Sequence, residues 1–187
     1  DVLDQRWHLE GTAPNFSREY NKIQMLGIAG NIAFGSWLVK SEVAYLDGLI
    51  YNTTTNEKSR VDALIGLEYT GLSDVVLSAE WANRHIVDYE AVMLNAADFV
   101  RRDEVTTAMR ASYTFDHDNA TVTYLLTRFG PQWQDGGFQR FWIDYDLTDS
   151  VKLSSGVIDY MASTGQKPFF DAIVDNDRIF FDVKYSF

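Results

Sequence analysis

The 187-residue sequence contains no cysteine, only three histidines and three prolines, and no long uninterrupted apolar segment. The lack of cysteine excludes a disulfide framework and thiol chemistry. No stretch approaches the roughly 18 consecutive apolar residues of a membrane helix, so a helical membrane protein is excluded. Basic residues are also scarce: 16 lysines and arginines against 27 acidic residues give a net charge of −11, which argues against nucleic-acid binding.

Aromatic residues, in contrast, make up 14% of the chain, and apolar residues alternate with polar ones. The last ten residues, 178–187, show this most clearly, because every odd-numbered residue from 179 to 187 is apolar. The residues between them are polar, with Phe180 as the one exception. Alternation with a period of two is typical of a strand with one apolar and one polar face.

The same alternation predicts nine strands, joined by connections that are alternately short and long. The predicted strands are 23–33, 37–51, 60–69, 75–88, 104–115, 120–129, 138–147, 151–161 and 178–187. The short connections are 34–36, 71–74, 116–119 and 148–150, and the long ones are 52–58, 89–103, 130–137 and 162–177. Within 89–103 we expect a short helix. An up-and-down meander with one tight and one loop-rich rim is typical of outer-membrane barrels.

Residues 1–21 are predicted to form an irregular N-terminal segment or extracellular loop, in which 6–13 could be one short strand. Residues 22–187 then form the barrel strands. Bacterial single-chain barrels have an even number of strands. Either the N-terminal segment supplies a tenth strand, or the chain is part of a larger barrel.

Two features favour a membrane barrel over a soluble lipocalin-like barrel, whose apolar face would point inward. The apolar faces end beside the short turns in aromatic residues, which predicts an interfacial girdle. The girdle residues are Tyr69, Tyr113, Phe115, Tyr145, Tyr185 and Phe187. The opposite faces carry charges of both signs, which a water-filled lumen accommodates. The candidate lumen-lining residues are Lys40, Glu42, Arg60, Asp62, Glu68, Glu80, Arg84, Arg110, Arg140, Asp144, Lys152, Asp182 and Lys184. The predicted fold is therefore an all-β, antiparallel up-and-down transmembrane β-barrel.

Several segments resemble one family of Gram-negative outer-membrane proteins, which are porin-like β-barrels of unknown function. The segments include G-N-I-A-F-G-S-W-L-V-K-S-E-V-A-Y at 30–45, K-S-R-V-D-A-L-I-G-L-E-Y at 58–69 and N-D-R-I-F-F-D-V-K-Y-S-F at 176–187. The resemblance covers most of residues 25–187 and implies a location in the bacterial outer membrane, in contact with lipid and lipopolysaccharide. Members of the family are usually longer, which implies that this chain is the C-terminal part of a larger barrel.

The same resemblance implies further partners and a broad function. A final strand that ends in phenylalanine resembles the strand through which such barrels engage the barrel assembly machinery. Members often occur alongside a periplasmic lipoprotein-like partner, near genes that handle hydrophobic compounds. The implied function is an outer-membrane channel or transport component that passes small, possibly hydrophobic molecules. The family carries no catalytic motif and implies no cofactor.

Two alternatives remain beside the channel. One is a plugged structural or interaction barrel that docks a periplasmic or extracellular partner. The other is a hydrolase at the rim, using His85 with Asp88 and Glu90 nearby, although no second catalytic partner can be placed.

Metal binding is a weaker possibility. The loop acids Asp171, Asp175 and Asp177 could offer oxygen ligands to Ca²⁺, but the loop lacks the glycine and closing glutamate of an EF-hand. A polar surface loop is the simpler interpretation, and no metal site is predicted.

Overall fold

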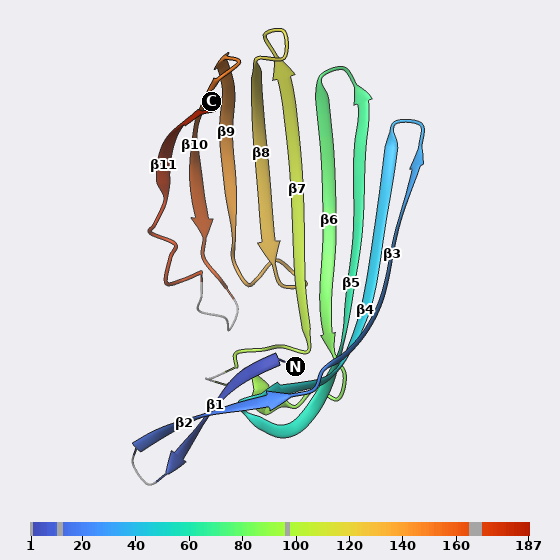
Figure 1. Ribbon diagram of the computed structural model, residues 1–187, viewed down its shortest axis with the longest axis vertical. Coiled ribbons are helices and arrows are strands. Elements are labelled where there is room, and N and C mark those ends of the chain that lie inside the picture. The colour runs from blue at the N-terminus through green and yellow to red at the C-terminus, as the bar shows by residue number, and fades with distance from the viewer. Residues whose placement is uncertain (1, 11–12, 96–97, 165–169) are drawn as a thin grey trace. The chain divides into compact units, whose positions relative to one another are not determined.

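The computed structural model describes residues 2–10, 13–95, 98–164 and 170–187, with side chains from residue 21 onward. Nine strands form one antiparallel sheet in which neighbours in sequence are neighbours in space (Figure 1). They are β3 (Gln24–Phe34), β4 (Trp37–Tyr51), β5 (Thr54–Leu72), β6 (Val75–Ile86), β7 (Asp103–Phe115), β8 (Ala120–Phe129), β9 (Gly137–Thr148), β10 (Val151–Met161) and β11 (Arg178–Tyr185). The predicted nine-stranded meander is confirmed. Strands β3 and β11 form the two edges of the described sheet, which is not closed.

The N-terminal segment differs from the prediction of an irregular connector. Strand β1 (Val2–Glu10) pairs antiparallel with β2 (Ala13–Asn21), in continuous register from Val2 opposite Asn21 to Glu10 opposite Ala13. The predicted single strand over 6–13 is therefore wrong. Proline, asparagine and serine near the start of β2 hid the strand, because these residues favour turns. The pair forms a separate two-stranded sheet, so it does not supply a tenth strand to the larger one.

The four predicted short connections are confirmed, and left-handed backbone closes three of them. Gly35 has φ of 56° in the β3–β4 turn, and Asp74 has φ of 62° in the β5–β6 turn. The β7–β8 turn holds three consecutive left-handed residues, Asp116, His117 and Asp118. Aspartate tolerates this conformation better than most residues, which explains why these turns are rich in aspartate.

Among the long connections, 52–58 is corrected. Strand β5 begins at Thr54, so only Asn52 and Thr53 join it to β4. Within the 89–103 connection, the expected short helix is present as the 3₁₀-helix η1 (Ala91–Leu94). None of the described residues belongs to a helix that is both long and apolar enough to cross a membrane.

The contacts divide the chain into two compact units, and each is described by itself. Unit 1 comprises Asp1–Ala29, Glu42–Ala63 and Asn83–Glu104, and unit 2 comprises Gly30–Ser41, Leu64–Ala82 and Val105–Phe187. Unit 1 buries Ile86 and Met93 almost completely. In unit 2, Phe170 is buried with its ring centroid 5.1 Å from that of Phe129.

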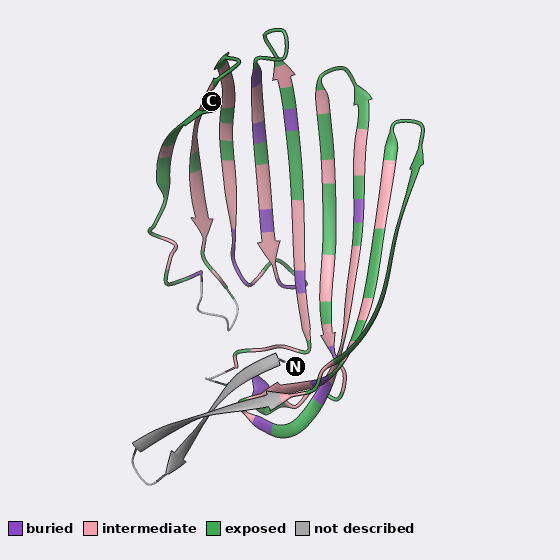
Figure 2. Ribbon diagram, in the orientation of Figure 1, coloured by how far each residue is buried: buried purple, intermediate pink, exposed green. Residues whose placement is uncertain are grey.

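In unit 2 many large apolar side chains are exposed and several polar side chains are buried. Phe141 and Phe181 are 51% and 68% exposed, whereas Thr123 and Ser112 are 1% and 8% exposed. Figure 2 shows exposed and less exposed residues alternating along these strands. A soluble domain has the reverse distribution, with its large apolar side chains inside. We call the two sides the apolar face and the polar face.

Candidate functional site on the polar face

The strand register assembles rows of polar-face residues across β7 to β11, since directly paired residues share a face. The first row contains three arginines, Arg110, Arg140 and Arg178. Leu125 on β8 and Ile158 on β10 lie between them. Neighbouring strands are about 4.8 Å apart, so successive arginines emerge from backbones about 10 Å apart.

The next row towards the short turns carries two large aromatic residues. It reads Ser112, Thr123, Trp142, Gly156 and Phe180 from β7 to β11. The Ser112 and Thr123 hydroxyl oxygens lie 3.1 Å apart and form a hydrogen bond with each other. The aromatic pair at its other end is separated only by the glycine.

Gly156 is required where it lies, although its backbone is ordinary extended strand. A Cβ atom there would approach the Phe141 carbonyl oxygen to 2.3 Å and the Trp142 Cβ to 2.6 Å. The missing side chain therefore lets β10 lie close to the β9 backbone at Phe141 and Trp142.

Arg140 lies against both aromatic side chains. Its guanidinium carbon is 4.5 Å from the Trp142 ring centroid and 4.6 Å from that of Phe180. Phe180, which interrupts the alternation in the sequence, thus lies on the polar face to stack on an arginine. Cation–π contact of this kind is favourable and holds the guanidinium in place.

The cluster continues towards the long loops. Arg178 donates a hydrogen bond of 2.8 Å to the Tyr160 hydroxyl, and its guanidinium lies 5.5 Å from that ring centroid. The Tyr160 ring in turn lies 6.5 Å from that of Phe138. We call this cluster the arginine–aromatic shelf; its residues are Phe138, Arg140, Trp142, Tyr160, Arg178 and Phe180.

Towards the short turns the charge changes sign. Asp144 and Asp182 share a row with Ser154, whose hydroxyl donates to Asp144 at 2.5 Å. Trp142 Nε1 also donates to Asp144, at 3.0 Å. In the following row Lys152 and Lys184 are directly paired across β10 and β11, and Lys152 forms a 3.2 Å ion pair with Asp146.

The remaining candidate lumen residues form smaller groups. In unit 2, Lys40 pairs with Glu68 at 3.7 Å, and Gly66 lies against Lys40 and Glu80, so these three charges share a face. In unit 1, Arg60 binds Asp62 at 2.7 Å. Glu42 and Arg84 are exposed. That all of these residues line a lumen remains a prediction.

The predicted girdle residues lie in unit 2, at the end of the apolar face near the short turns. Phe115 and Tyr145 share one row through Ala120, and Tyr145 donates a 3.3 Å hydrogen bond to Asp116 in the β7–β8 turn. Rings also stack along single strands: Tyr113 on Phe115 at 5.8 Å and Tyr185 on Phe187 at 6.4 Å. Tyr69 packs against Trp37 at 4.4 Å.

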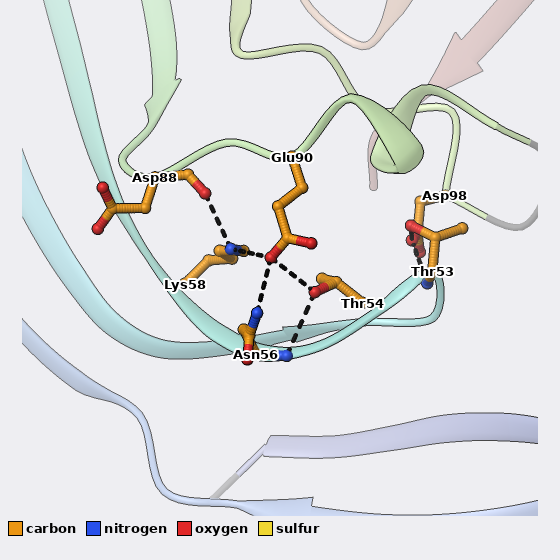
Figure 3. A network of polar contacts seen from close by, with 7 residues as sticks. All are labelled: Thr53, Thr54, Asn56, Lys58, Asp88, Glu90 and Asp98. Atoms are coloured by element: carbon orange, nitrogen blue, oxygen red, sulfur yellow. Dashed lines mark hydrogen bonds and ion pairs between the residues drawn. The ribbon is translucent and has the colours of Figure 1, made fainter.

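A second polar cluster, in unit 1, was not predicted from the sequence (Figure 3). Lys58 is buried, and its ammonium donates to the Asp88 carbonyl at 2.8 Å and to Glu90 Oε1 at 2.6 Å. The same carboxylate oxygen accepts hydrogen bonds from Thr54 and Asn56, each of 2.9 Å. These contacts explain why the polar segment 54–58 is a strand: its side chains bind the segment that follows β6.

Asp98 attaches the same connection, which follows β6, to the β4–β5 turn. Its carboxylate accepts from the backbone N–H groups of Asn52 and Thr53 at 2.9 and 2.7 Å, and from the Thr53 hydroxyl. The sequence contains one indication of this cluster: polar residues alternate at Thr54, Asn56 and Lys58, as they would along one face of a strand. The partners lie 30 or more positions away, so no local sequence pattern indicates them.

This network predicts an acid-sensitive attachment. The Lys58 ammonium, followed by Asn56 and Thr54, lowers the pKa of Glu90 from 4.5 to about 2. A carboxyl whose pKa is lowered by folding contributes its full stability above about pH 4.5 and loses it as the pH falls towards 2. Amide hydrogen exchange in 87–95, corrected for intrinsic rates, should therefore accelerate across that range in the wild type and be fast at all pH values in Glu90→Gln.

Asp88→Asn is the matched control, because only the backbone carbonyl of Asp88 binds Lys58. Asparagine also tolerates the φ of 53° at this position. The control should keep the wild-type pH profile. An unchanged profile in Glu90→Gln would show that Glu90 does not attach this segment.

The geometry gives little support to the hydrolase site considered at His85. His85 Nδ1 lies 2.7 Å from Asp103, which also accepts from Asn83 at 2.9 Å. Glu90, expected near His85, is instead held by Lys58. This is the arrangement of a histidine that is hydrogen-bonded to a structural carboxylate.

Two of the three loop acids that were weak metal candidates bind backbone groups, and the third, Asp175, is exposed. Asp171 accepts from the Ser163 N–H and Asp177 from the Tyr160 N–H, both at 2.8 Å. Over the described ranges, no three histidine or acidic side chains are gathered in a way that could hold a metal ion.

These features define an all-β protein with an up-and-down antiparallel sheet, one apolar exposed face and one charged face. Residues 8–187 match a family described as "Protein of unknown function (DUF1302)", and the chain belongs to this family. No curated protein and no solved structure matches the chain.

Proposed function

We propose that the chain forms part of a β-barrel in the bacterial outer membrane and acts as a channel or transport component. The barrel passes small molecules, hydrophobic ones among them, along the polar face of the sheet. The observation that carries this proposal is the distribution of side chains in unit 2, where large apolar side chains of one face are exposed and the polar side chains Ser112, Thr123 and Thr127 of the other face are buried. Lipid is the solvent in which such a face is stable.

The height of the apolar face fits a bilayer. On β9 it is bounded by Gln139, which hydrogen-bonds Asp159 and Tyr124, and by Thr148 beside the β9–β10 turn. This stretch spans about 31 Å at about 3.4 Å per residue. At a strand tilt of about 40° it projects to about 24 Å, close to the apolar band of about 25 Å in known outer-membrane barrels.

The apolar face also contains a hollow of about 330 Å³. Small residues, Ala79 and Ala111, lie in it between Trp37, Leu67 and Met109. An acyl chain of a lipid or lipopolysaccharide fills such an irregular apolar surface.

The open edges set a further requirement. Backbone groups at a strand edge must be hydrogen-bonded within lipid. Strands β3 and β11 are both edges of the described sheet. In the membrane each must therefore gain a partner strand, which agrees with a barrel larger than nine strands and with insertion by the barrel assembly machinery.

Ion conductance tests the channel. The protein, folded in detergent and added to planar bilayers in KCl, should give discrete current steps. Stable folding into bilayers without current would favour the plugged barrel instead. A protein that remains folded and monodisperse without detergent would overturn the membrane assignment altogether.

The interaction barrel is a second candidate because of the network in unit 1. The segment after β6 is attached to β5 through Glu90 and to the β4–β5 turn through Asp98. A preorganised loop loses little entropy on docking a partner, such as a periplasmic lipoprotein-like protein or an extracellular one.

A further inference from the structure

Three arginines of the polar face differ in their partners from two of its lysines. Lys40 and Lys152 each form an ion pair with a carboxylate. Within the part of the chain that the structure describes, no carboxylate pairs with Arg110, Arg140 or Arg178. Arg110 contacts the Ser112 hydroxyl at 3.2 Å and Arg178 contacts Tyr160.

Arg140 is the clearest case. Its Nε is buried and has no hydrogen-bond partner among the described residues. The ring contacts to Trp142 and Phe180 engage the guanidinium through π-systems and supply no acceptor for the Nε–H group. A buried donor without an acceptor is unfavourable, so a ligand oxygen that reaches this guanidinium would be stabilising.

The residues around the arginine row favour a ligand that has an apolar part as well as an anionic group. The rows next to the arginines supply Trp142 and Phe180 on one side, and Phe138 and Tyr160 on the other. Adjacent rows on one face lie about 7 Å apart. A ligand whose acidic group reaches Arg140 therefore places its body against aromatic rings.

The acidic row fixes the orientation of such a ligand. Asp144 and Asp182 lie beyond Trp142 and Phe180, so an anionic head group is repelled there and attracted at the arginine row. Arg140 and Arg178 lie nearer the long connections than the short turns, which places them near one mouth of the proposed channel.

We propose that the arginine–aromatic shelf binds hydrophobic carboxylic acids in their anionic form, with the carboxylate at Arg140 and Arg178 and the apolar body on Trp142 and Phe180. This rests on the proposed function, because it names the class of solute that the channel selects. Planar carboxylates suit the bidentate geometry of arginine.

Binding is tested by calorimetry on the detergent-folded protein, with 2-naphthoate as the probe. The neutral 2-naphthalenemethanol and the small anion acetate should each bind at least about tenfold more weakly. Arg140→Gln and Trp142→Leu should each weaken 2-naphthoate binding by about tenfold or more. Lys152→Gln, which removes one positive charge from a paired residue on the same face, should leave binding unchanged.

Two results would overturn the shelf as a carboxylate site. One is equal affinity for 2-naphthoate and 2-naphthalenemethanol, which indicates apolar partition alone. The other is unchanged binding in Arg140→Gln, provided that heat-modifiable migration on gels shows the variant to be folded.

The bilayer assay separates this proposal from the channel itself. In an open channel, 2-naphthoate should interrupt the KCl current in the wild type and in Lys152→Gln, and not in Arg140→Gln. A current that 2-naphthoate does not interrupt would support the channel and contradict carboxylate binding at the shelf. Arg140-dependent binding without any current keeps the shelf and rejects the channel.

Discussion

Ile143→Arg should strongly destabilise the folded protein in a bilayer. Ile143 is 38% exposed on the apolar face of β9, paired with Val122 and Ser155, near the middle of the apolar band. An arginine at the midplane of a membrane barrel costs about 2–4 kcal/mol, which shifts a folding equilibrium on the order of 10²-fold. Urea titration of the protein in liposomes, followed by heat-modifiable migration on gels, measures this loss.

Thr121→Arg is the matched control on the polar face. Thr121 pairs with Thr114 and Asp144, so the added guanidinium meets a carboxylate and water instead of lipid. It should fold at nearly the wild-type urea concentration. If Ile143→Arg folds as well as Thr121→Arg, the exposed apolar face is not in contact with lipid. Higher solubility of Ile143→Arg without detergent would point to a soluble protein.

Gly156→Val should give the largest loss of folded protein among substitutions on the polar face. Even the Cβ would overlap the Phe141 carbonyl oxygen and Trp142, so β10 must shift away from β9 or the indole must leave its place. Overpacking of this kind costs about 1–3 kcal/mol or more. Displacement of Trp142 also disturbs Arg140, so 2-naphthoate binding should fall in any fraction that folds.

Gly30→Val provides the comparison, since a Cβ on Gly30 of β3 meets no atom within 4 Å. Valine has a higher strand propensity than glycine, so this variant should fold as well as the wild type. Equal folded yields for the two variants, measured by gel migration, would show that Gly156 is not sterically required.

The strands and short turns could be predicted because their signals are local. Alternation marks each strand, and turn-forming residues such as Asp74 and Asp116 mark its end. The polar and apolar faces follow directly from the same period.

What the sequence did not reveal depends on pairing over long distances. Residues 54–58 are polar enough to be taken for a loop, and only Glu90, more than 30 positions later, makes them a strand. The arginine row required the register of four strand pairs, which alternation does not determine. Phe180 interrupts the apolar–polar alternation because its ring stacks on Arg140, a contact between two strands that the sequence does not indicate.

The rows of the polar face have one more consequence for a solute that moves along the strands. In the proposed channel it would meet, in order, a cationic row at Arg140, an aromatic row at Trp142, an anionic row at Asp144 and a row in which Lys184 lies beside the Lys152–Asp146 ion pair. For a monovalent acid this profile is two wells separated by a barrier. The acid would move in steps of about 20 Å between Arg140 and Lys184. The rate of each step would be set by repulsion from Asp144 and Asp182.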